Sequence, residues 1–169
     1  MRLFFALWPD DVVRAGIAVV AASIAARAGG RAVPAAKLHL TLTFLGDVAD
    51  ERVADAVEAA SSVRGRGFEV VLDVLGSFRD ARVAWAGLSS VPPGLAALQS
   101  SLDLELRERN FALDDRPFAA HATLARRIAK SIPREAMAPI AWNVREFVLV
   151  RSETGRGSYT VMERWKLEG

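Results

Sequence analysis

The pattern of apolar and polar positions predicts a strand, a helix and a second strand in the first 45 residues. An apolar run with aromatic residues over Arg2–Trp8 indicates a buried strand. Pro9-Asp10-Asp11 supplies a proline and acidic residues to the first turn of a helix, whose apolar periodicity continues to about Ala28 and stops at Gly29-Gly30. After a loop over 31–36, alternating residues over Lys37–Leu45 indicate another strand.

The remaining pattern predicts three more helical or irregular segments and five strands. The expected helices cover 50–63 and 92–110, the latter with an apolar face of leucines at 95, 98, 102 and 106. The segment 129–139 is expected to be irregular or a short helix. The expected strands cover 68–78, 82–88, 118–126, 142–151 and 158–167, with a hairpin loop over 152–157 joining the last two.

One order of elements occurs twice along the chain, with a period of about 80 residues. A strand, a long helix and a second strand follow one another over 2–45 and again over 82–126. This order is typical of an internal duplication. It predicts one domain over 1–169 built of two similar lobes, related by a pseudo-two-fold axis that brings the third elements of the two repeats together.

Composition narrows the class of protein. The chain is 51% hydrophobic and 25% charged, which is typical of a globular domain, and no apolar run reaches the roughly 18 residues of a membrane span. The apolar N-terminus is interrupted by Pro9, so we interpret it as a core strand of a cytoplasmic protein rather than a signal peptide. The absence of cysteine excludes disulfides, thiol nucleophiles and cysteine-based metal sites. A net charge of +2 favours a short RNA end or a small ligand over long RNA.

The second strand of each repeat carries the same His-x-Thr-x pattern, and these two patterns contain the only two histidines of the chain. The segments are His39-Leu40-Thr41-Leu42 and His121-Ala122-Thr123-Leu124. Because side chains two apart on a strand share a face, His39, Thr41 and Thr43 are expected on one face, with the residues between them on the other. His121 and Thr123 likewise share a face. If the two faces meet in a cleft, two imidazoles and two hydroxyls surround one small volume.

This set of groups suits phosphodiester chemistry. A neutral imidazole can take a proton from water while a protonated one gives a proton to a leaving oxygen. Threonine hydroxyls can donate to the non-bridging phosphate oxygens, whose charge grows in the transition state. A strained cyclic phosphodiester fits best, and no metal-ligand motif accompanies either histidine, so we expect no cofactor and no metal. Two alternatives are ordinary structural histidines and a metal site formed by both histidines with carboxylates.

The chain resembles the two-histidine phosphoesterase superfamily, and in particular the LigT-like RNA 2′,3′-cyclic phosphodiesterases, also called 2′-5′ RNA ligases. Both motifs with their flanks carry the resemblance, together with the opening strand and the C-terminal hairpin. The matching segments are Arg2–Ala6, Pro34–Gly46, Arg116–Arg126 and Leu149–Ser152, followed by Gly155, Gly157 and Tyr159-Thr160. One departure is Ala120, where the family often has proline.

The resemblance implies a bilobal α+β fold with antiparallel sheets around a central cleft. It also implies hydrolysis of RNA 2′,3′-cyclic phosphate ends to 2′-phosphate ends, with His39 as proton donor and His121 as proton acceptor. Reverse ligation to a 2′-5′ bond would exchange these roles. Thr41 and Thr123 would bind the phosphate, and Arg126 matches a family arginine expected near it. Strict alternation places Arg126 on the face of the strand opposite to that of His121. Arg126 therefore reaches the cleft only if the strand ends or bulges before residue 126.

The leading hypothesis is therefore a monomeric, metal-independent enzyme that acts on RNA 3′ ends bearing a 2′,3′-cyclic phosphate, without membrane partners. One alternative is a phosphoesterase for a small cyclic nucleotide or for 2′-5′ oligonucleotides. The other is an RNA- or nucleotide-binding module without turnover, against which the intact histidines and threonines of both motifs argue.

Overall fold

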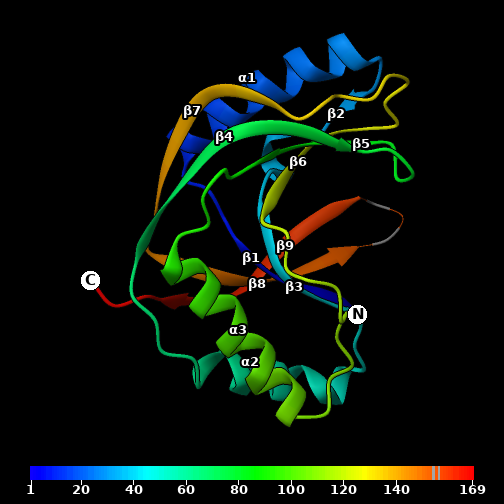
Figure 1. Cartoon of the computed structure of the whole chain (residues 1–169). Coiled ribbons are helices and arrows are strands. Elements are labelled where there is room, and N and C mark those ends of the chain that lie inside the picture. Colours follow the sequence, from blue (N-terminus) through cyan, green and yellow to red (C-terminus); the bar gives the residue numbers. More distant parts are fainter. Residues whose placement is uncertain (154, 156) are drawn as a thin grey trace.

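The structure is a mixed α+β fold in which two four-stranded antiparallel halves join edge to edge (Figure 1). It is a computed structural model that describes residues 1–153, 155 and 157–169. One half, the β3 half, contains β3 (Leu40–Asp47), β1 (Arg2–Leu7), β8 (Glu146–Glu153) and β9 (Ser158–Lys166). The other, the β6 half, contains β6 (His121–Arg126), β5 (Val83–Gly87), β4 (Phe68–Phe78) and β7 (Glu135–Val144).

The strand order is β7-β4-β5-β6-β3-β1-β8-β9, and the short strand β2 (Arg31–Ala32) pairs with β6. The two halves meet where β3 pairs with β6, through the residue pair Leu40 and Ala122. The same order of strands occurs on both sides of this junction. The strand with the histidine motif (β3 or β6) comes first, the first strand of the same repeat (β1 or β5) comes second, and two further strands follow. The predicted α+β class with antiparallel sheet is confirmed, whereas the pseudo-two-fold relation of whole lobes stays a prediction.

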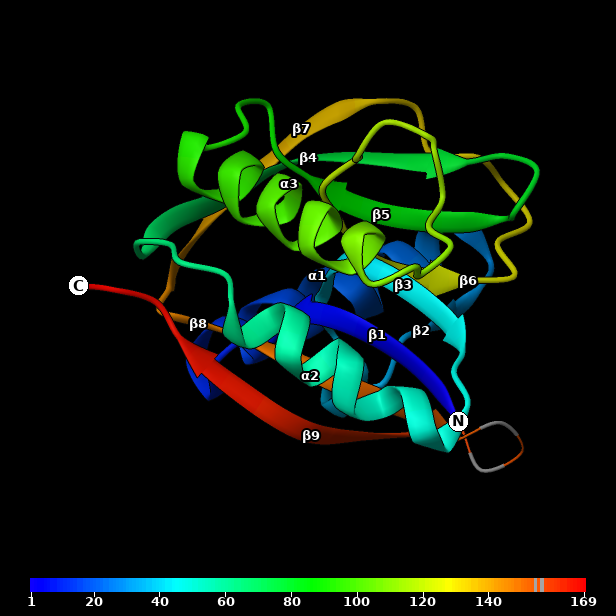
Figure 2. The same ribbon diagram turned by 90° about the horizontal axis from the view of Figure 1, so that it is seen from below.

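The two long helices pack on different parts of the sheet. Helix α1 (Asp11–Ala28) follows β1 and packs on β6 and β7. Helix α3 (Pro93–Glu108) follows β5 and packs on β3 and β4, beside α2 (Val53–Ser61). In Figure 1, α1 lies at one end of the molecule and α2 and α3 at the other, and in Figure 2, seen from below, α2 and α3 lie in front of α1.

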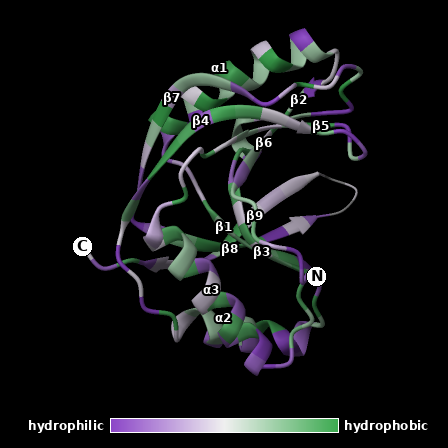
Figure 3. Ribbon diagram, in the orientation of Figure 1, coloured by the Kyte–Doolittle hydropathy of each residue, from purple (hydrophilic) through white to green (hydrophobic). Residues whose placement is uncertain are grey.

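Local sequence explains the helices and the core. The Asp10 side chain accepts from the Val13 N–H at 2.9 Å as the N-cap of α1, and Gly29 ends that helix at φ 73°. The four leucines expected on the apolar face of α3 are all buried. Figure 3 shows predominantly hydrophobic residues along the central strands, in keeping with this core. No helix in the described part of the chain is both long and apolar enough to cross a membrane.

Three expectations about the elements are wrong. The segment 129–139, expected to be irregular or a short helix, contains the start of strand β7, which tolerates Pro139 because it is an edge strand with an irregular register against β4. The expected strand 142–151 is two strands, which turn at Arg145. The expected loop 31–36 contains β2 and the 3-10 turn Ala35–Lys37.

The remaining differences concern boundaries. Both motif strands begin later than expected, so that His39 immediately precedes β3 and His121 is the first residue of β6. The helix expected over 50–63 begins as the 3-10 turn Asp50–Arg52 before α2. Of the expected hairpin loop over 152–157, positions 154 and 156 lie outside the described residues.

Candidate active site

The register between β3 and β6 brings the two motifs together. Because Leu40 pairs with Ala122 in an antiparallel arrangement, His39 lies opposite Thr123 and His121 lies opposite Thr41. Leu40 and Ala122 are fully buried, so the motif residues on either side of them share the opposite, accessible face. Two imidazoles and two hydroxyls therefore alternate around one small area of the sheet, as the sequence predicted.

The last residue of each motif forms a β-bulge. On β3, Thr41 and Thr43 pair with the consecutive residues Ala6 and Phe5 of β1, which leaves Leu42 as the extra residue. On β6, Thr123 and Ala125 pair with the consecutive residues Trp85 and Ala84 of β5, which leaves Leu124 extra. A bulge shifts the alternation of side chains by one residue. The residue five positions after each histidine therefore returns to the accessible face.

These bulges settle where Arg126 and Thr43 lie. Arg126 is exposed and lines the same cavity as His39 and Thr123, so the bulge that this placement requires is present. The expectation that Thr43 shares the face of His39 is wrong. Thr43 is only 7% exposed, and its hydroxyl donates to Asp103 Oδ1 of α3 at 2.7 Å.

Both imidazoles are held by the same local hydrogen bond. Nδ1 of His39 lies 2.7 Å from the Lys37 carbonyl oxygen, and Nδ1 of His121 lies 2.7 Å from the Ala119 carbonyl oxygen. A carbonyl can only accept, so each Nδ1 carries a proton and each neutral ring keeps its lone pair on Nε2. Nε2 of His39 is 2.9 Å from Thr41 Oγ1. Both rings are thus oriented with Nε2 as the atom available for proton transfer.

The His39 ring is enclosed by aromatic side chains. Trp8 stacks on it with a centroid distance of 5.7 Å, Phe4 lies at 4.8 Å, and Tyr159 meets it edge-on at 5.5 Å. This burial lowers the pKa of His39 from its ordinary value of 6.5 to about 4, although the hydrogen bond to the Lys37 carbonyl acts in the opposite direction. The positive charge of Arg126 lowers the pKa further.

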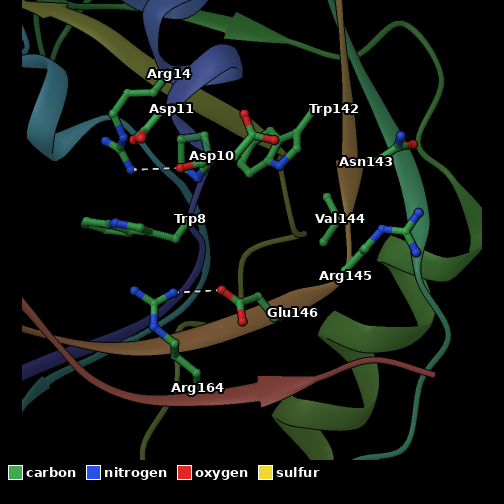
Figure 4. A pocket seen from close by; sticks show the side chains of 11 residues that line it. Trp8, Asp10, Asp11, Arg14, Trp142, Asn143, Val144, Arg145, Glu146 and Arg164 are labelled. Atoms are coloured by element: carbon green, nitrogen blue, oxygen red, sulfur yellow. Dashed lines mark hydrogen bonds and ion pairs between the residues drawn. The ribbon is translucent and has the colours of Figure 1, made fainter. Parts of the chain in front are cut away.

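Arg14 of α1 supports this enclosure from behind. Its guanidinium lies 5.1 Å from the centre of the Trp8 ring and donates to the carbonyl oxygens of Leu38 and Pro9 at 3.0 and 3.2 Å. Figure 4 shows Arg14 beside Trp8 in a cavity of about 690 Å³, which is also bordered by the ion pair of Arg164 and Glu146. No motif residue lines that cavity, so it lies outside the motif face.

His121 has a more open environment. Phe78 of β4 meets its ring edge-on at 5.1 Å. Burial again lowers the pKa of the ring, assisted by the charge of Arg126 and opposed by the hydrogen bond to the Ala119 carbonyl. Both imidazoles are therefore biased toward the neutral form in the ligand-free protein.

The accessible face opens into two cavities of different character. The cationic pocket, of about 310 Å³, contains His39 and Thr123 together with Arg31, Lys37, Arg126 and Arg127. The aromatic pocket, of about 640 Å³, contains Thr41 and His121. It is lined by three phenylalanines and three charged residues: Phe44, Phe78, Phe118, Asp103, Asp114 and Arg116. Sequence reasoning missed Arg31, Lys37 and Arg14, and it did not place Trp8 against His39. Only their proximity to His39 in space identifies them.

Within the described residues, no group of three or more histidine, cysteine, aspartate or glutamate side chains is placed to hold a metal ion. The functional groups of the motif face are thus imidazoles, hydroxyls and guanidiniums. Together they can donate to phosphate oxygens and exchange protons with the atoms attached to phosphorus.

The chain matches known proteins over nearly its whole length. A family model described as LigT like Phosphoesterase matches residues 7–85. The RNA 2′,3′-cyclic phosphodiesterase of Escherichia coli K12 is 34% identical over 98% of this chain and 96% of its own. The protein of the same name from Thermus thermophilus is 33% identical over 100% of this chain and 91% of its own. The crystal structure of Escherichia coli LigT complexed with 3′-AMP superposes with a TM-score of 0.89 at 34% identity, covering 98% of this chain and 97% of that one.

Proposed function

The chain belongs to the LigT-like phosphoesterase family, and we propose that it hydrolyses the 2′,3′-cyclic phosphodiester ends of RNA to 2′-phosphate ends, with His39 and His121 as its acid and base. One observation carries the proposal. The pairing of Leu40 with Ala122 sets each histidine opposite the threonine of the other motif, on one accessible face. The names of the relatives supply the class of substrate.

The resemblance to the family assigns the two proton transfers, and the orientation of both rings, with Nε2 available, is compatible with that assignment. His121 Nε2 takes a proton from water, and the water oxygen forms a bond to phosphorus. The bond between phosphorus and the 3′ oxygen breaks, and Nε2–H of His39 gives its proton to that oxygen. The product is a 2′-phosphate with a free 3′-hydroxyl. Each ring finishes in the other's initial protonation state, so proton exchange with solvent completes the cycle.

The threonines and Arg126 act on the non-bridging phosphate oxygens. The hydroxyls of Thr41 and Thr123 donate to these oxygens, which carry more charge in the transition state than in the substrate. Arg126 shares a cavity with His39 and Thr123, and its guanidinium can donate to the same group.

The proton donor has to be charged before the reaction, although burial keeps the pKa of His39 at about 4 in the free protein. A bound phosphodiester places a negative charge beside the ring, which favours the imidazolium and raises its pKa. Substrate binding and protonation of His39 are therefore coupled. In the reverse direction, formation of a 2′-5′ bond, the two histidines exchange roles. The cytoplasmic location and the monomeric state remain parts of this proposal.

The direct test is hydrolysis of adenosine 2′,3′-cyclic phosphate in EDTA, with the position of the product phosphate determined by ³¹P NMR. We expect a 2′-phosphate from the wild type. His39→Ala and His121→Ala should each lower the rate by about 10²–10⁴, the contribution of one general acid or base. Thr160→Ala, at an exposed position of β9, is the matched control and should retain the wild-type rate.

Circular dichroism and thermal melting of each variant separate loss of chemistry from loss of fold. A folded histidine variant with near-normal hydrolysis would contradict the proposal. So would a wild type that is folded but inactive on the cyclic nucleotide and on a cyclic-phosphate-ended oligonucleotide, which would favour a binding module instead.

A further inference from the structure

We propose that the cationic pocket beside His39 binds a second phosphate group, attached to the 5′ oxygen of the same nucleoside that carries the cyclic phosphate. The inference rests on the proposed function and names the substrate more closely. It predicts that the enzyme distinguishes a nucleoside cyclic phosphate with a 5′-phosphate, or with a preceding nucleotide, from one with a free 5′-hydroxyl.

The balance of charge in the pocket favours a second phosphate. The cationic pocket holds four basic side chains, and no described residue that lines it is an aspartate or a glutamate. In the described part of the chain, none of the four forms an ion pair with a carboxylate. The reacting cyclic phosphodiester carries a single negative charge, and Arg126 with the threonine hydroxyls can satisfy it. Arg31, Lys37 and Arg127 remain in excess of what the reacting group requires.

The fold gathers these charges at an energetic cost. Arg31 on β2 pairs directly with Arg126 on β6, and like charges directly opposite in a sheet are destabilising. Arg127 follows at φ 54°, a left-handed conformation that is unfavourable for residues other than glycine. Strain of this kind persists where the surrounding structure enforces it, and an anionic ligand would offset the repulsion between the guanidiniums.

The backbone around the pocket is fixed by hydrogen bonds. The side chain of Arg82 donates to the carbonyl oxygen of Ile128 at 3.0 Å and to that of Arg127 at 3.4 Å. The N–H of Val33 donates to the carbonyl oxygen of the bulged residue Leu124 at 2.8 Å. The pocket is therefore built from tied segments rather than from a free loop.

The direction of the reaction places the ribose beside this pocket. The attacking water and the departing 3′ oxygen lie on opposite sides of phosphorus in an in-line displacement. Since His121 takes the proton from water and His39 protonates the 3′ oxygen, the ribose lies on the His39 side. That side is the cationic pocket, which holds His39 but not His121. The 5′ oxygen of this ribose, and any phosphate on it, is thereby directed toward Arg31, Lys37 and Arg127.

The test compares kcat/KM for three substrates: adenosine 2′,3′-cyclic phosphate, the same compound with a 5′-phosphate, and the dinucleotide ApA with a 5′-hydroxyl and a terminal 2′,3′-cyclic phosphate. For the wild type we expect the 5′-phosphorylated compound to exceed the unphosphorylated one by about 10-fold to 100-fold, the effect of one or two charged hydrogen bonds. Arg31→Gln and Arg127→Gln should each reduce this ratio by about 10-fold. Arg134→Gln is the control of equal charge, because Arg134 is exposed and lines neither pocket.

The outcomes distinguish an internucleotide phosphate from a terminal 5′-phosphate. They also distinguish failure of this inference from failure of the proposed function. A gain for both extended substrates supports recognition of an internucleotide phosphate, and a gain for the 5′-phosphate alone supports a small nucleotide substrate. A gain for the dinucleotide alone would assign the effect to its second nucleoside and overturn the inference. Equal kcat/KM for all three substrates would also overturn it and leave the proposed function intact. Absence of hydrolysis of all three would reject the proposed function, and this inference with it.

Discussion

At the scale of single residues, the two histidines of this chain are prepared in the same way and differ in their surroundings. Each ring donates from Nδ1 to the carbonyl oxygen two positions before it. His39 is then enclosed by three aromatic rings, whereas Phe78 alone contacts His121 among the aromatic side chains described. The two imidazoles therefore have the same orientation and unequal burial.

The unequal burial predicts a pH dependence. Burial lowers the pKa of His39 to about 4 and also lowers that of His121 below 6.5. Because kcat/KM reports ionisations of the free enzyme, both limbs of its bell-shaped profile should lie below pH 6.5. The bound phosphate raises the pKa of both rings, so the optimum for kcat should lie at higher pH than the optimum for kcat/KM. Initial rates between pH 4 and 9 measure both profiles.

His121→Ala provides the control for this profile, since its residual activity should lose the limb that belongs to His121. An optimum of kcat/KM at or above pH 7 would contradict the account, because it would mean that the free imidazoles are not desolvated.

Sequence reasoning found the residues that recur in both motifs and missed those that act from elsewhere. His39, Thr41, His121 and Thr123 were identifiable because a fixed spacing on a strand determines a shared face. Trp8 and Arg14 surround His39 through stacking and through hydrogen bonds to backbone carbonyls. Neither residue has a spacing that links it to the motif, so the chain alone did not place them beside His39.

At the scale of elements, the bulges explain the main difference between the predicted and the observed site. Strict alternation placed Thr43 with the histidine and Arg126 away from it. The bulges at Leu42 and Leu124 reverse both placements. A bulge adds one residue to one strand only, so its location depends on pairing with a neighbouring strand. Periodicity within a single segment cannot reveal it.

Strand β7 illustrates the same limit for the fold. Most strands and the two long helices were predictable, α1 from the signals at its ends, Asp10 and Gly29, and α3 from its face of leucines. Pro139 disfavoured a strand over 129–139, and only the position of β7 at the edge of the sheet makes it acceptable.

Two glycine substitutions, one next to the end of β6 and one within α1, are expected to change stability in opposite directions. A Cβ on Gly30 would lie 2.7 Å from the carbonyl oxygen of Arg126 and 2.8 Å from Ile128 Cγ2, so Gly30→Ala should destabilise the protein by about 1–3 kcal/mol. Gly16, within α1, has only the Ile140 side chain at 3.8 Å from such a Cβ. Gly16→Ala should stabilise it by about 0.5–1 kcal/mol, because alanine is the better helix former.

Urea unfolding of the two variants measures both effects against the wild type. A Gly30→Ala protein as stable as the wild type would show that the end of α1 and the end of β6 are not closely packed. Because Gly30 precedes Arg31, Gly30→Ala should also weaken the cationic pocket.

At the scale of the whole molecule, two halves of similar strand order contribute one histidine each. Their junction is the pair Leu40 and Ala122, and the motif face lies directly on it. The two pockets beside this junction differ, because arginines line the cationic pocket and phenylalanines line the aromatic pocket. The repeated strand order brings the two motifs together at one junction, and the different pockets make the two sides of the motif face unequal.

The central claim is the direction of the reaction, with His121 on the side of the water and His39 on the side of the 3′ oxygen. It is tested most directly by a substrate in which sulfur replaces the 3′ oxygen of the cyclic phosphate. A thiolate leaves without the proton that an alkoxide requires. We therefore expect the sulfur substrate to restore most of the cleavage rate lost in His39→Ala and none of that lost in His121→Ala. Restoration in His121→Ala instead, or equal losses on both substrates in the two variants, would contradict the account.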